Sequence, residues 1–439
     1  MKPVWTLEQV IAQLTRGRQT WSNGSLYYSF PNSVPAEDQN NSNWSTFQPF
    51  TAAQREGVRA VFGHLAELTN LRFVERPDDG HSTTRMTFAN WGRPVSMGLS
   101  STVQQADGSR LAFAGQIFLQ TEGLIGDYTV GGFNYGLLLH EIAHPLGLAH
   151  PADYGANGLP LNYNNSAVYH QDTVQYTNMS YFSPVYSGGA NTLSNRWSPS
   201  TYLLHDIAAL QHLYGANMTT RTGDNVYGFN SNAGAAYQLT SSSQPVFTIW
   251  DAGGVDTMDF SGYAHRARID LNAGEFSDVG GLVGNVSIAF GVVMENAIGG
   301  SGTDFISGNA LDNRVTGGGG FDLLHGNAGA DIFVFRELGD STTHARRSDG
   351  RKIMPDLLDD FTSGVDRIDL SAIDAVPTTG ADDAFAFIGT SAFAGVAGQL
   401  RYEVVDGRTH ILADVDGNGI ADIHIITNSA ALQASDFIL

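Results

Sequence analysis

The sequence predicts an α+β domain followed by an all-β domain that is built as a parallel β-roll. Up to about residue 217, stretches with apolar residues at helical spacing alternate with short strand-like runs, a mixture typical of α+β proteins. Beyond that point helical periodicity fades, and glycine recurs every nine residues between short apolar runs, which is typical of a β-roll. We therefore expect three regions: residues 1–18 as an N-terminal helix or short propeptide, residues 19–217 as the α+β domain, and residues 218–439 as the β-roll with the C-terminal segment.

Four helices are predicted in the first part of the chain from the spacing of apolar residues. They cover residues 1–20, 51–68, 134–146 and 202–213, and the last of them ends at Gly215. Short β-rich runs predict strands at residues 25–30, 71–74, 85–88 and 111–119.

The composition excludes several classes of protein. Asp and Glu outnumber Lys and Arg by 44 to 23, and the net charge of -21 argues against a non-specific nucleic-acid binder. A surplus of carboxylates does suit calcium, which prefers oxygen ligands. The chain has no cysteine, which excludes disulfide scaffolds and thiol catalysis. No apolar run approaches the roughly 20 residues that a membrane span needs, so we expect none.

The strongest functional motif runs from His140 to His150 and reads His-Glu-Ile-Ala-His-Pro-Leu-Gly-Leu-Ala-His. His140 and His144 lie one helical turn apart and can reach one metal ion, while Gly147 allows a sharp turn that returns His150 as a third ligand. Three nitrogen ligands leave a coordination position open for water, and Glu141 lies beside the first ligand as a candidate base. The pattern predicts one catalytic zinc ion, and the alternative is a helix that carries three histidines without a metal.

Pro145 follows the second histidine directly, inside the predicted helix. It has no N–H to donate to the carbonyl of Glu141, and it biases His144 away from helical dihedral angles. We therefore expect the helix to kink or end at this point, which would change the placement of His144 and hence the metal affinity or the activity.

The motif HExxHxxGxxH is that of the metzincin metallopeptidases, and over nearly its whole length the chain resembles the serralysins, secreted bacterial proteases of that class. The resemblance implies that Met179 in Tyr176–Tyr181 is the Met-turn methionine, and that Tyr181 binds zinc at rest and stabilises the transition state. Without the resemblance both would be interpreted as core residues. Residues 111–119 are the candidate edge strand for pairing with substrate backbone. His205 stands where an acidic residue is usual, and we interpret it as an exposed helix histidine without a role.

A nonapeptide array begins at Gly299 and repeats at Gly308, Gly317 and Gly326. Its sixth positions are Asp304, Asn313, Asp322 and Asp331, and its eighth positions are Ile306, Val315, Leu324 and Phe333. This matches the repeat G-G-x-G-x-D-x-U-x, in which glycine carbonyls and an aspartate face calcium while the apolar residue points inward. Folding should then depend on calcium, because the stacked carboxylates would otherwise repel one another. The alternative is a β-solenoid without metal.

Several structural calcium ions are therefore expected, and the resemblance extends their ligands to the loops that precede the array. The expected ligands are Arg221, Gly223, Asn225, Asp251, Gly253, Gly254, Asp256, Glu295, Gly300, Gly302, Asp304, Asn309, Asn313, Gly318, Gly320, Asp322, Asn327, Gly329 and Asp331. Asp360 and Asp366 are candidates for closing the far side of the array, with surface carboxylates as the alternative. Residues 414–422 have half of an EF-hand pattern but lack its final glutamate, which favours a hairpin turn.

The resemblance implies a monomeric, broadly specific zinc endopeptidase that cleaves proteins and peptides, with Glu141 as the general base on a zinc-bound water. The N-terminal residues lack a secretory h-region, and Asp436–Leu439 is similar to the C-terminal signal by which serralysins address the type I secretion apparatus. An extracellular location follows from this, and a protein inhibitor is a further expected partner. The rival hypothesis is a calcium-binding surface or adhesion protein with an impaired protease domain, supported by Pro145 and by a region between Leu99 and Gly132 that is shorter than in typical serralysins.

Overall fold

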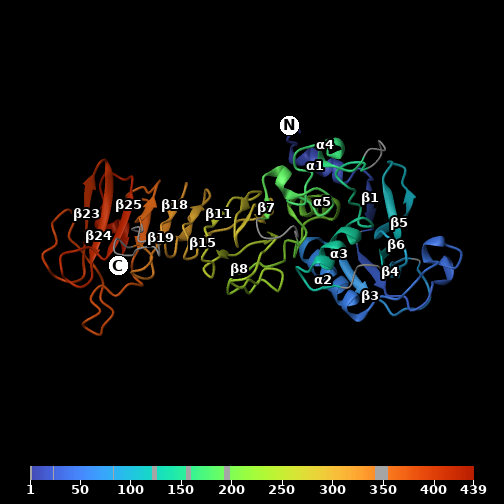
Figure 1. Ribbon diagram of the computed structural model, residues 1–439, viewed down its shortest axis with the longest axis horizontal. Helices are drawn as coiled ribbons and strands as arrows, with labels where there is room; N and C mark the ends of the chain where they lie inside the picture. The colour runs from blue at the N-terminus through green and yellow to red at the C-terminus, as the bar shows by residue number, and fades with distance from the viewer. Residues whose placement is uncertain are drawn as a thin grey trace. The chain divides into compact units, whose positions relative to one another are not determined.

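The computed structural model describes residues 2–22, 24–82, 84–120, 126–154, 160–191, 198–341 and 354–439. The chain forms two compact units, and Figure 1 shows few helices and many short strands, most of them in parallel sheets. The first unit contains residues 1–222, 245–252 and 283–290, and the second contains residues 223–244, 253–282 and 291–439.

The first unit holds the α-helices found in the described ranges and a mixed sheet. The helices are α1 (Leu7–Leu14), α2 (Ala52–Leu68), α3 (Phe133–Ala143), α4 (Tyr163–Ser166) and α5 (Leu204–Tyr214), with 3-10 turns at Ala36–Asp38, Ser42–Trp44 and Pro184–Ser187. The strands are β1 (Gln19–Trp21), β2 (Ser25–Ser29), β3 (Arg72–Glu75), β4 (Met86–Trp91), β5 (Met97–Gln104), β6 (Arg110–Gln120), β7 (Ala190–Asn191), β9 (Phe247–Ile249) and β14 (Val286–Ile288).

The main sheet of this unit has the order β1-β6-β4-β2-β3, all parallel, and β5 adds to it antiparallel to β6. Helix α2 begins at a capping box in which Thr51 and Gln54 satisfy each other's backbone N–H groups. Its buried face includes Val58, Val61 and Leu65, all fully buried, at the spacing that predicted this helix.

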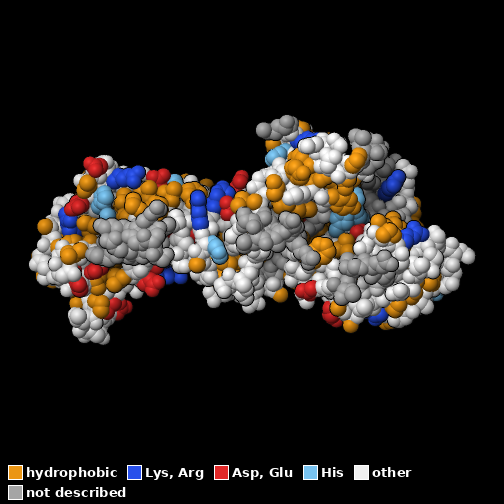
Figure 2. All heavy atoms as spheres, in the orientation of Figure 1, with side chains coloured by type: hydrophobic (Ala, Val, Ile, Leu, Met, Phe, Trp, Pro, Cys, Tyr) orange, Lys and Arg blue, Asp and Glu red, His pale blue; other side chains and the backbone are white. Residues whose placement is uncertain are grey.

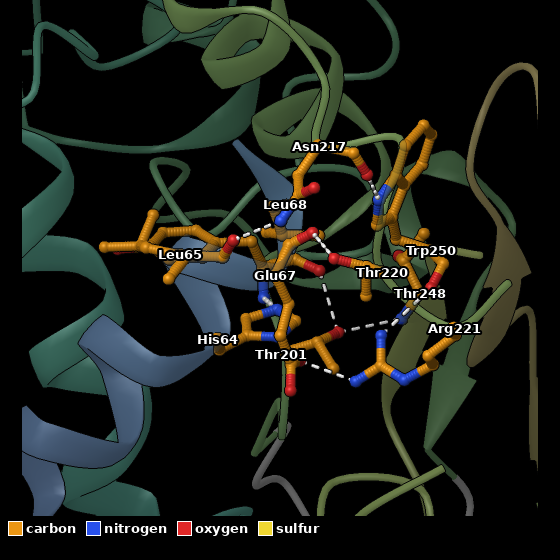
Figure 3. A network of polar contacts seen from close by, with 12 residues as sticks. His64, Leu65, Glu67, Leu68, Thr201, Asn217, Thr220, Arg221, Thr248 and Trp250 are labelled. Carbon is orange, nitrogen blue, oxygen red and sulfur yellow. Dashed lines mark hydrogen bonds and ion pairs between the residues drawn. The ribbon is translucent and has the colours of Figure 1, made fainter. Parts of the chain in front are cut away.

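The end of α2 is tied to segments that lie far away in sequence (Figure 3). Glu67 forms a 2.5 Å ion pair with Arg221, and its carbonyl accepts the hydroxyl of Thr220 at 2.7 Å. Thr248 N donates to the Thr201 hydroxyl at 2.8 Å, and this bond places β9 in the first unit although its residue numbers fall within the region predicted for the β-roll.

The second unit is made almost entirely of short strands. They are β8 (Val226–Gly228), β10 (Thr257–Asp259), β11 (Arg268–Asp270), β12 (Phe276–Ser277), β15 (Asn296–Ile298), β16 (Phe305–Ser307), β17 (Arg314–Thr316), β18 (Leu323–His325), β19 (Ile332–Val334), β20 (Asp356–Leu358), β21 (Arg367–Asp369), β22 (Ala386–Phe387), β23 (Gln399–Val405), β24 (Arg408–Asp414), β25 (Ile423–Thr427) and β26 (Phe437–Ile438), with a 3-10 turn at Ala434–Asp436. Strand β13 (Leu282–Val283) falls on the sequence boundary between the units.

Successive repeats of the array contribute strands alternately to two parallel sheets. One sheet contains β15, β17 and β19, and the other contains β16 and β18, so strands within a sheet are 18 residues apart. The eighth positions of the repeats, listed above as Ile306, Val315, Leu324 and Phe333, are all fully buried, which confirms that they point inward. The antiparallel strands β24 and β25 are joined through residues 415–422, as a hairpin connection predicts.

On the part of the surface that Figure 2 draws in colour, Lys and Arg side chains occur in small separate groups among uncharged and hydrophobic areas. None of the helices in the described ranges combines the length and the apolar character that crossing a membrane requires.

Candidate metal centre and active site

Helix α3 carries His140 and Glu141, and His144 follows as its C-terminal cap. It ends at Ala143, two residues before Pro145, so the expectation that the helix stops here is confirmed. The expectation that Pro145 would move His144 out of helical dihedral angles is wrong, because His144 has φ -58° and ψ -57° as the C-terminal cap. The two histidine rings therefore stay one turn apart, with centroids 4.9 Å apart.

The chain turns sharply after the helix and brings back the third histidine. Gly147 has φ +105°, and a Cβ at this position would overlap the backbone oxygen of Gln19, so only glycine fits. His150 Nε2 then lies 3.3 Å from His140 Nε2, and ligand nitrogens of the three histidines lie within 4.8 Å of one another.

Backbone carbonyls hold the other ring nitrogens of the first two histidines. His140 Nδ1 lies 2.7 Å from the carbonyl of Asn178, and His144 Nδ1 lies 2.9 Å from that of Leu148. This leaves both Nε2 atoms free as ligands, as is usual for metal-binding histidines. Burial lowers the pKa of His140 to about 3 and that of His150 to about 4, so both rings are neutral. Zn–N bonds of about 2.0–2.1 Å in a tetrahedron place nitrogens roughly 3.3 Å apart, so these residues fit zinc.

Glu141 faces the same space as the histidines and is only 5% exposed. It lines a cavity of about 300 Å³ together with His140, His144, His150, Tyr181 and the segment Ser96–Gly98. Burial raises the pKa of Glu141 to about 8, and a backbone hydrogen bond from Gly98 opposes that rise. Like that hydrogen bond, the positive charge of a bound zinc ion would lower the pKa of Glu141.

Tyr181 lies at the open side of the centre. Its hydroxyl is 2.9 Å from His150 Nε2, and its side chain is 51% exposed. Met179 is fully buried in the preceding turn, where its N–H donates to the Thr177 hydroxyl at 3.0 Å. The structure therefore brings Tyr181 to the histidines and places Met179 in a tight turn, as the resemblance implied.

Asp206, which no sequence motif pointed to, holds this turn in place. Its fully buried carboxylate accepts the Thr177 hydroxyl at 2.5 Å and the N–H groups of Asn178 and Leu203 at 2.7 and 3.1 Å. Because the carbonyl of Asn178 in turn holds His140, Asp206 supports the metal centre indirectly, through Asn178. A signal was available, since Asp206 lies three residues after Leu203 and four before Leu210, on the buried face of α5.

The neighbouring His205 is also buried, so its interpretation as an exposed histidine is wrong. It is 4% exposed, and its ring packs against Tyr176 with a centroid distance of 4.8 Å. Burial lowers its pKa to about 3. His205 is therefore a neutral core residue of the first unit.

A second buried carboxylate, Asp172, lies behind the centre. It accepts the hydroxyls of Tyr154 at 2.6 Å and Ser180 at 2.8 Å. The Tyr154 ring packs against His150 at 5.3 Å and against Tyr181 at 4.9 Å between centroids. Asp172 thus fixes one wall of the space in which Tyr181 lies.

The expected substrate-pairing strand is also corrected. Residues 111–119 lie in β6, which pairs with β1, β4 and β5, so its backbone groups are already used within the sheet. The strand beside the catalytic cavity is β5, whose first residues Met97 and Gly98 line it. A larger cavity of about 750 Å³ adjoins His140 and Glu141 and is walled by apolar groups that include Phe133, Leu137, Val174, Phe182, Pro184 and Pro199.

In the second unit, the aspartates of the repeats form two ladders of carboxylate-to-backbone bonds. In one ladder Asp304 N donates to Asp322, and Asp322 N donates to Asp356, at 2.7 and 2.8 Å. In the other, Asn313 N donates to Asp331, and Asp331 N donates to Asp366, at 2.8 and 3.0 Å. Asp356 lies outside the nine-residue period, so the repeat pattern does not predict its place in the ladder.

The remaining expected calcium ligands fall into both units. Arg221 and Asp251 belong to the first unit, whereas Gly223, Asn225, Gly253, Gly254 and Asp256 belong to the second. Within the second unit, Asp256 accepts the N–H of Asn225 at 2.8 Å and donates its own N–H to Glu295 at 2.7 Å. Gly300, Gly302, Gly318, Gly320 and Gly329 lie in the turns of the array, where a Cβ at Gly320 would overlap the carbonyl of Gly302. Asn309 and Asn327 use their amides on neighbouring carbonyls.

Three converging imidazoles beside a buried glutamate, carried by an α+β unit that precedes a β-roll, define the chain as a metzincin-type metalloendopeptidase. Residues 216–439 match the family model "Peptidase M10 serralysin C terminal". Aligned over its whole length, the chain is 40% identical to serralysin G of Dickeya chrysanthemi, of which it covers 92%. It is 38% identical to metallopeptidase AprA of Pseudomonas marginalis and to metalloprotease AprA of Pseudomonas entomophila (strain L48), covering 92% and 91% of them. The chain belongs to the serralysin family and is a secreted zinc metalloendopeptidase; the alternative of an adhesion protein with an impaired protease domain is not favoured.

Proposed function

We propose that His140, His144 and His150 bind one catalytic zinc ion, with Tyr181 as a further ligand at rest, and that Glu141 is the general base. The observation that carries this proposal is the 3.3 Å separation of the Nε2 atoms of His140 and His150, with His144 completing the cluster. When bound, zinc supplies Lewis acidity to the scissile carbonyl and makes water a stronger acid.

The protein's own groups perform the proton transfers and the positioning. Glu141 takes a proton from the attacking water and passes it to the leaving amine. The Tyr181 hydroxyl donates a hydrogen bond to the oxyanion that develops on the carbonyl. Strand β5 pairs with the extended substrate backbone, which aligns the peptide bond with Glu141.

The larger cavity supports broad specificity for proteins and peptides. Its walls are mainly apolar, and Glu141 is the single acidic residue among its lining residues in the described ranges. An apolar pocket discriminates weakly between side chains of similar size, at about 1–3 kcal/mol per methylene group. A bulky apolar side chain next to the scissile bond should therefore be favoured without being required.

The test is hydrolysis of a quenched fluorescent casein by wild type, Glu141→Gln and the control Glu56→Gln, a surface carboxylate of α2. Wild type is also stripped with a zinc-selective chelator and refilled with zinc. We expect Glu141→Gln to bind zinc but lose activity by a factor of at least 100, within the range known for acid–base groups. Activity that survives in Glu141→Gln would refute the role of the base, and activity that survives zinc removal would refute the metal assignment.

We propose further that the β-roll binds several calcium ions between its turns. The second carboxylate oxygens of Asp322, Asp331 and Asp356 are buried without a hydrogen-bond partner in the described residues. A bound cation would stabilise such oxygens, and calcium prefers oxygen ligands of this kind. The proposed ligands are the residues of the array and its flanks given above, with Asp356 and Asp366 added. Chelation of calcium should unfold the second unit, as followed by circular dichroism, and an unchanged spectrum would refute this.

We also propose export through the type I secretion apparatus, with Asp436–Leu439 as the recognised segment, and a monomeric enzyme open to a protein inhibitor. In the folded protein Phe437 and Ile438 form β26 and pair with β21, so recognition has to precede folding. Replacing Phe437 and Ile438 by serine should abolish export from a cell that carries the apparatus. Light scattering of the purified enzyme tests the monomeric state.

A further inference from the structure

The amino-terminal segment is built into the first unit. Helix α1 begins at a capping box formed by Thr6 and Gln9, and its residues Val10 and Leu14 are fully buried. Ahead of the helix, Trp5 stacks on Tyr169 with ring centroids 4.4 Å apart. Residues 2–16 therefore have the packing of a permanent element rather than of a detachable propeptide.

The end of α1 contacts the segment that carries the third histidine. The carbonyl of Leu14 accepts the N–H of Ala149 at 2.7 Å, and Gln13 Nε2 donates to the carbonyl of Pro151 at 2.7 Å. Arg16 donates through Nη1 to the carbonyl of His150 itself. Its Nη2 forms a 2.8 Å ion pair with Asp153.

These contacts matter because His150 differs from the other two histidines in its support. His140 and His144 are carried by α3, and carbonyls hold their Nδ1 atoms. His150 comes after the turn at Gly147, in a stretch without regular secondary structure. Its position therefore depends on what holds its backbone, and three bonds within residues 149–151 come from Gln13 and Leu14 of α1 and from Arg16 just after it.

A second attachment keeps the segment in register. Trp5 N donates to Gln171 Oε1 at 3.0 Å, and Gln171 Nε2 donates back to the Trp5 carbonyl at 2.8 Å. Lys2 also donates to the backbone carbonyls of Asn164 and Ala167. The segment is thus fixed at both ends, so α1 is a rigid support for the residues around His150.

We propose that Arg16 is a positioning residue for the third zinc ligand, and that residues 2–16 stay in the active enzyme for this reason. The inference rests on the zinc site proposed above. Arg16 suits the task because its planar fork holds separate N–H donors in fixed directions, one toward the His150 carbonyl and one toward the Asp153 carboxylate, whereas the donors of a lysine share one nitrogen on a flexible stem. Loss of an outer-shell partner lowers metal affinity by about 10–100-fold in known sites.

The test compares full-length wild type with Arg16→Ala, Arg16→Lys and Gln13→Glu. The substitution Gln13→Glu replaces the amide that donates to the Pro151 carbonyl by a carboxylate, which can only accept. The matched control is Arg59→Ala on α2, because Arg59 is also a partly exposed arginine (38%, against 32% for Arg16) in ion pairs. The readouts are the zinc dissociation constant by chelator competition, the visible spectrum of the cobalt-substituted enzyme, and the melting temperature of the zinc-free protein.

We expect Arg16→Ala and Gln13→Glu to raise the zinc dissociation constant roughly 10-fold, with an altered cobalt spectrum. Arg16→Lys should give a smaller rise, and Arg59→Ala should leave both readouts unchanged. Unchanged zinc affinity in Arg16→Ala, or an equal loss in Arg59→Ala, would overturn the inference while leaving the zinc site intact. Failure of wild type itself to bind zinc would refute the proposed function instead. Isolation of a mature active form that begins after residue 16 and binds zinc normally would also overturn the inference.

Discussion

The strongest structural prediction concerns Asp206→Ala, a substitution that touches neither zinc ligand nor substrate. The carboxylate of Asp206 accepts three buried donors, from Thr177, Asn178 and Leu203. Alanine would leave all three without a partner, at about 1–2 kcal/mol each. Burial raises the pKa of Asp206 to about 6, so removal of a costly buried charge offsets part of this loss at pH 7. We expect a net loss of roughly 3 kcal/mol in the free energy of unfolding of the first unit.

The same substitution should weaken zinc binding, because the carbonyl of Asn178 fixes His140 Nδ1 at 2.7 Å. We expect the zinc dissociation constant to rise about 10–100-fold, measured by chelator competition at a temperature where the variant is folded. The matched control is Asp436→Ala in the second unit, since Asp436 is also fully buried and accepts a serine hydroxyl and two N–H groups. A variant at Asp206 that binds zinc as tightly as wild type would refute the reasoning, as would an equal loss of zinc affinity in the control.

Three further predictions follow from the geometry. Tyr181→Phe should lower kcat about 10–100-fold in casein hydrolysis while KM changes little, and an unchanged kcat would exclude a role for the hydroxyl in the transition state. Asp322→Asn should raise the calcium concentration needed to fold the second unit. In chelator at pH 7 the same substitution should stabilise that unit, because burial raises the pKa of Asp322 to about 8. Circular dichroism with and without calcium checks both the expected loss and the expected gain of stability. Since the folded protein holds the Asp206 proton more tightly than the unfolded chain, the first unit should lose stability as the pH rises from 3.8 through about 6, and Asp206→Asn should flatten that slope in thermal melts.

Local spacing allowed much of this molecule to be predicted from its sequence. The interval of four between His140 and His144 fixes one helical face, and the glycine at Gly147 fixes where the chain can turn. The nine-residue period of the array likewise predicts the buried apolar positions, because each repeat sees the same surroundings as its neighbours. In both cases the decisive contacts lie within a few residues or one repeat along the chain.

What the sequence did not reveal depends on contacts between distant segments. Asp206 reaches the Met-turn across 28 residues, and Arg16 reaches His150 across 134. Burial of such groups cannot be predicted from their residue type, since charged residues are usually exposed. The interpretation of residues 111–119 as an edge strand failed for the same reason: the hydrophobic pattern shows a strand, but its neighbours are set by the whole sheet.

Pro145 shows how a long-range contact can resolve a local conflict. Proline removes one N–H and ends α3, which taken alone disturbs the helix that carries the first two histidines. The structure places the helix end against β1, where Trp21 Nε1 and Gln19 Nε2 both donate to the Pro145 carbonyl at 2.7 Å. On the other side, a Cβ at Gly98 would overlap the carbonyl of Glu141, the group that loses its helical partner, so β5 packs directly on it. The helix end is therefore held by β1 and β5 in addition to the turn bonds from Gly147 N to His144 O and from Leu148 N to Ala143 O, and together they keep His144 in helical geometry.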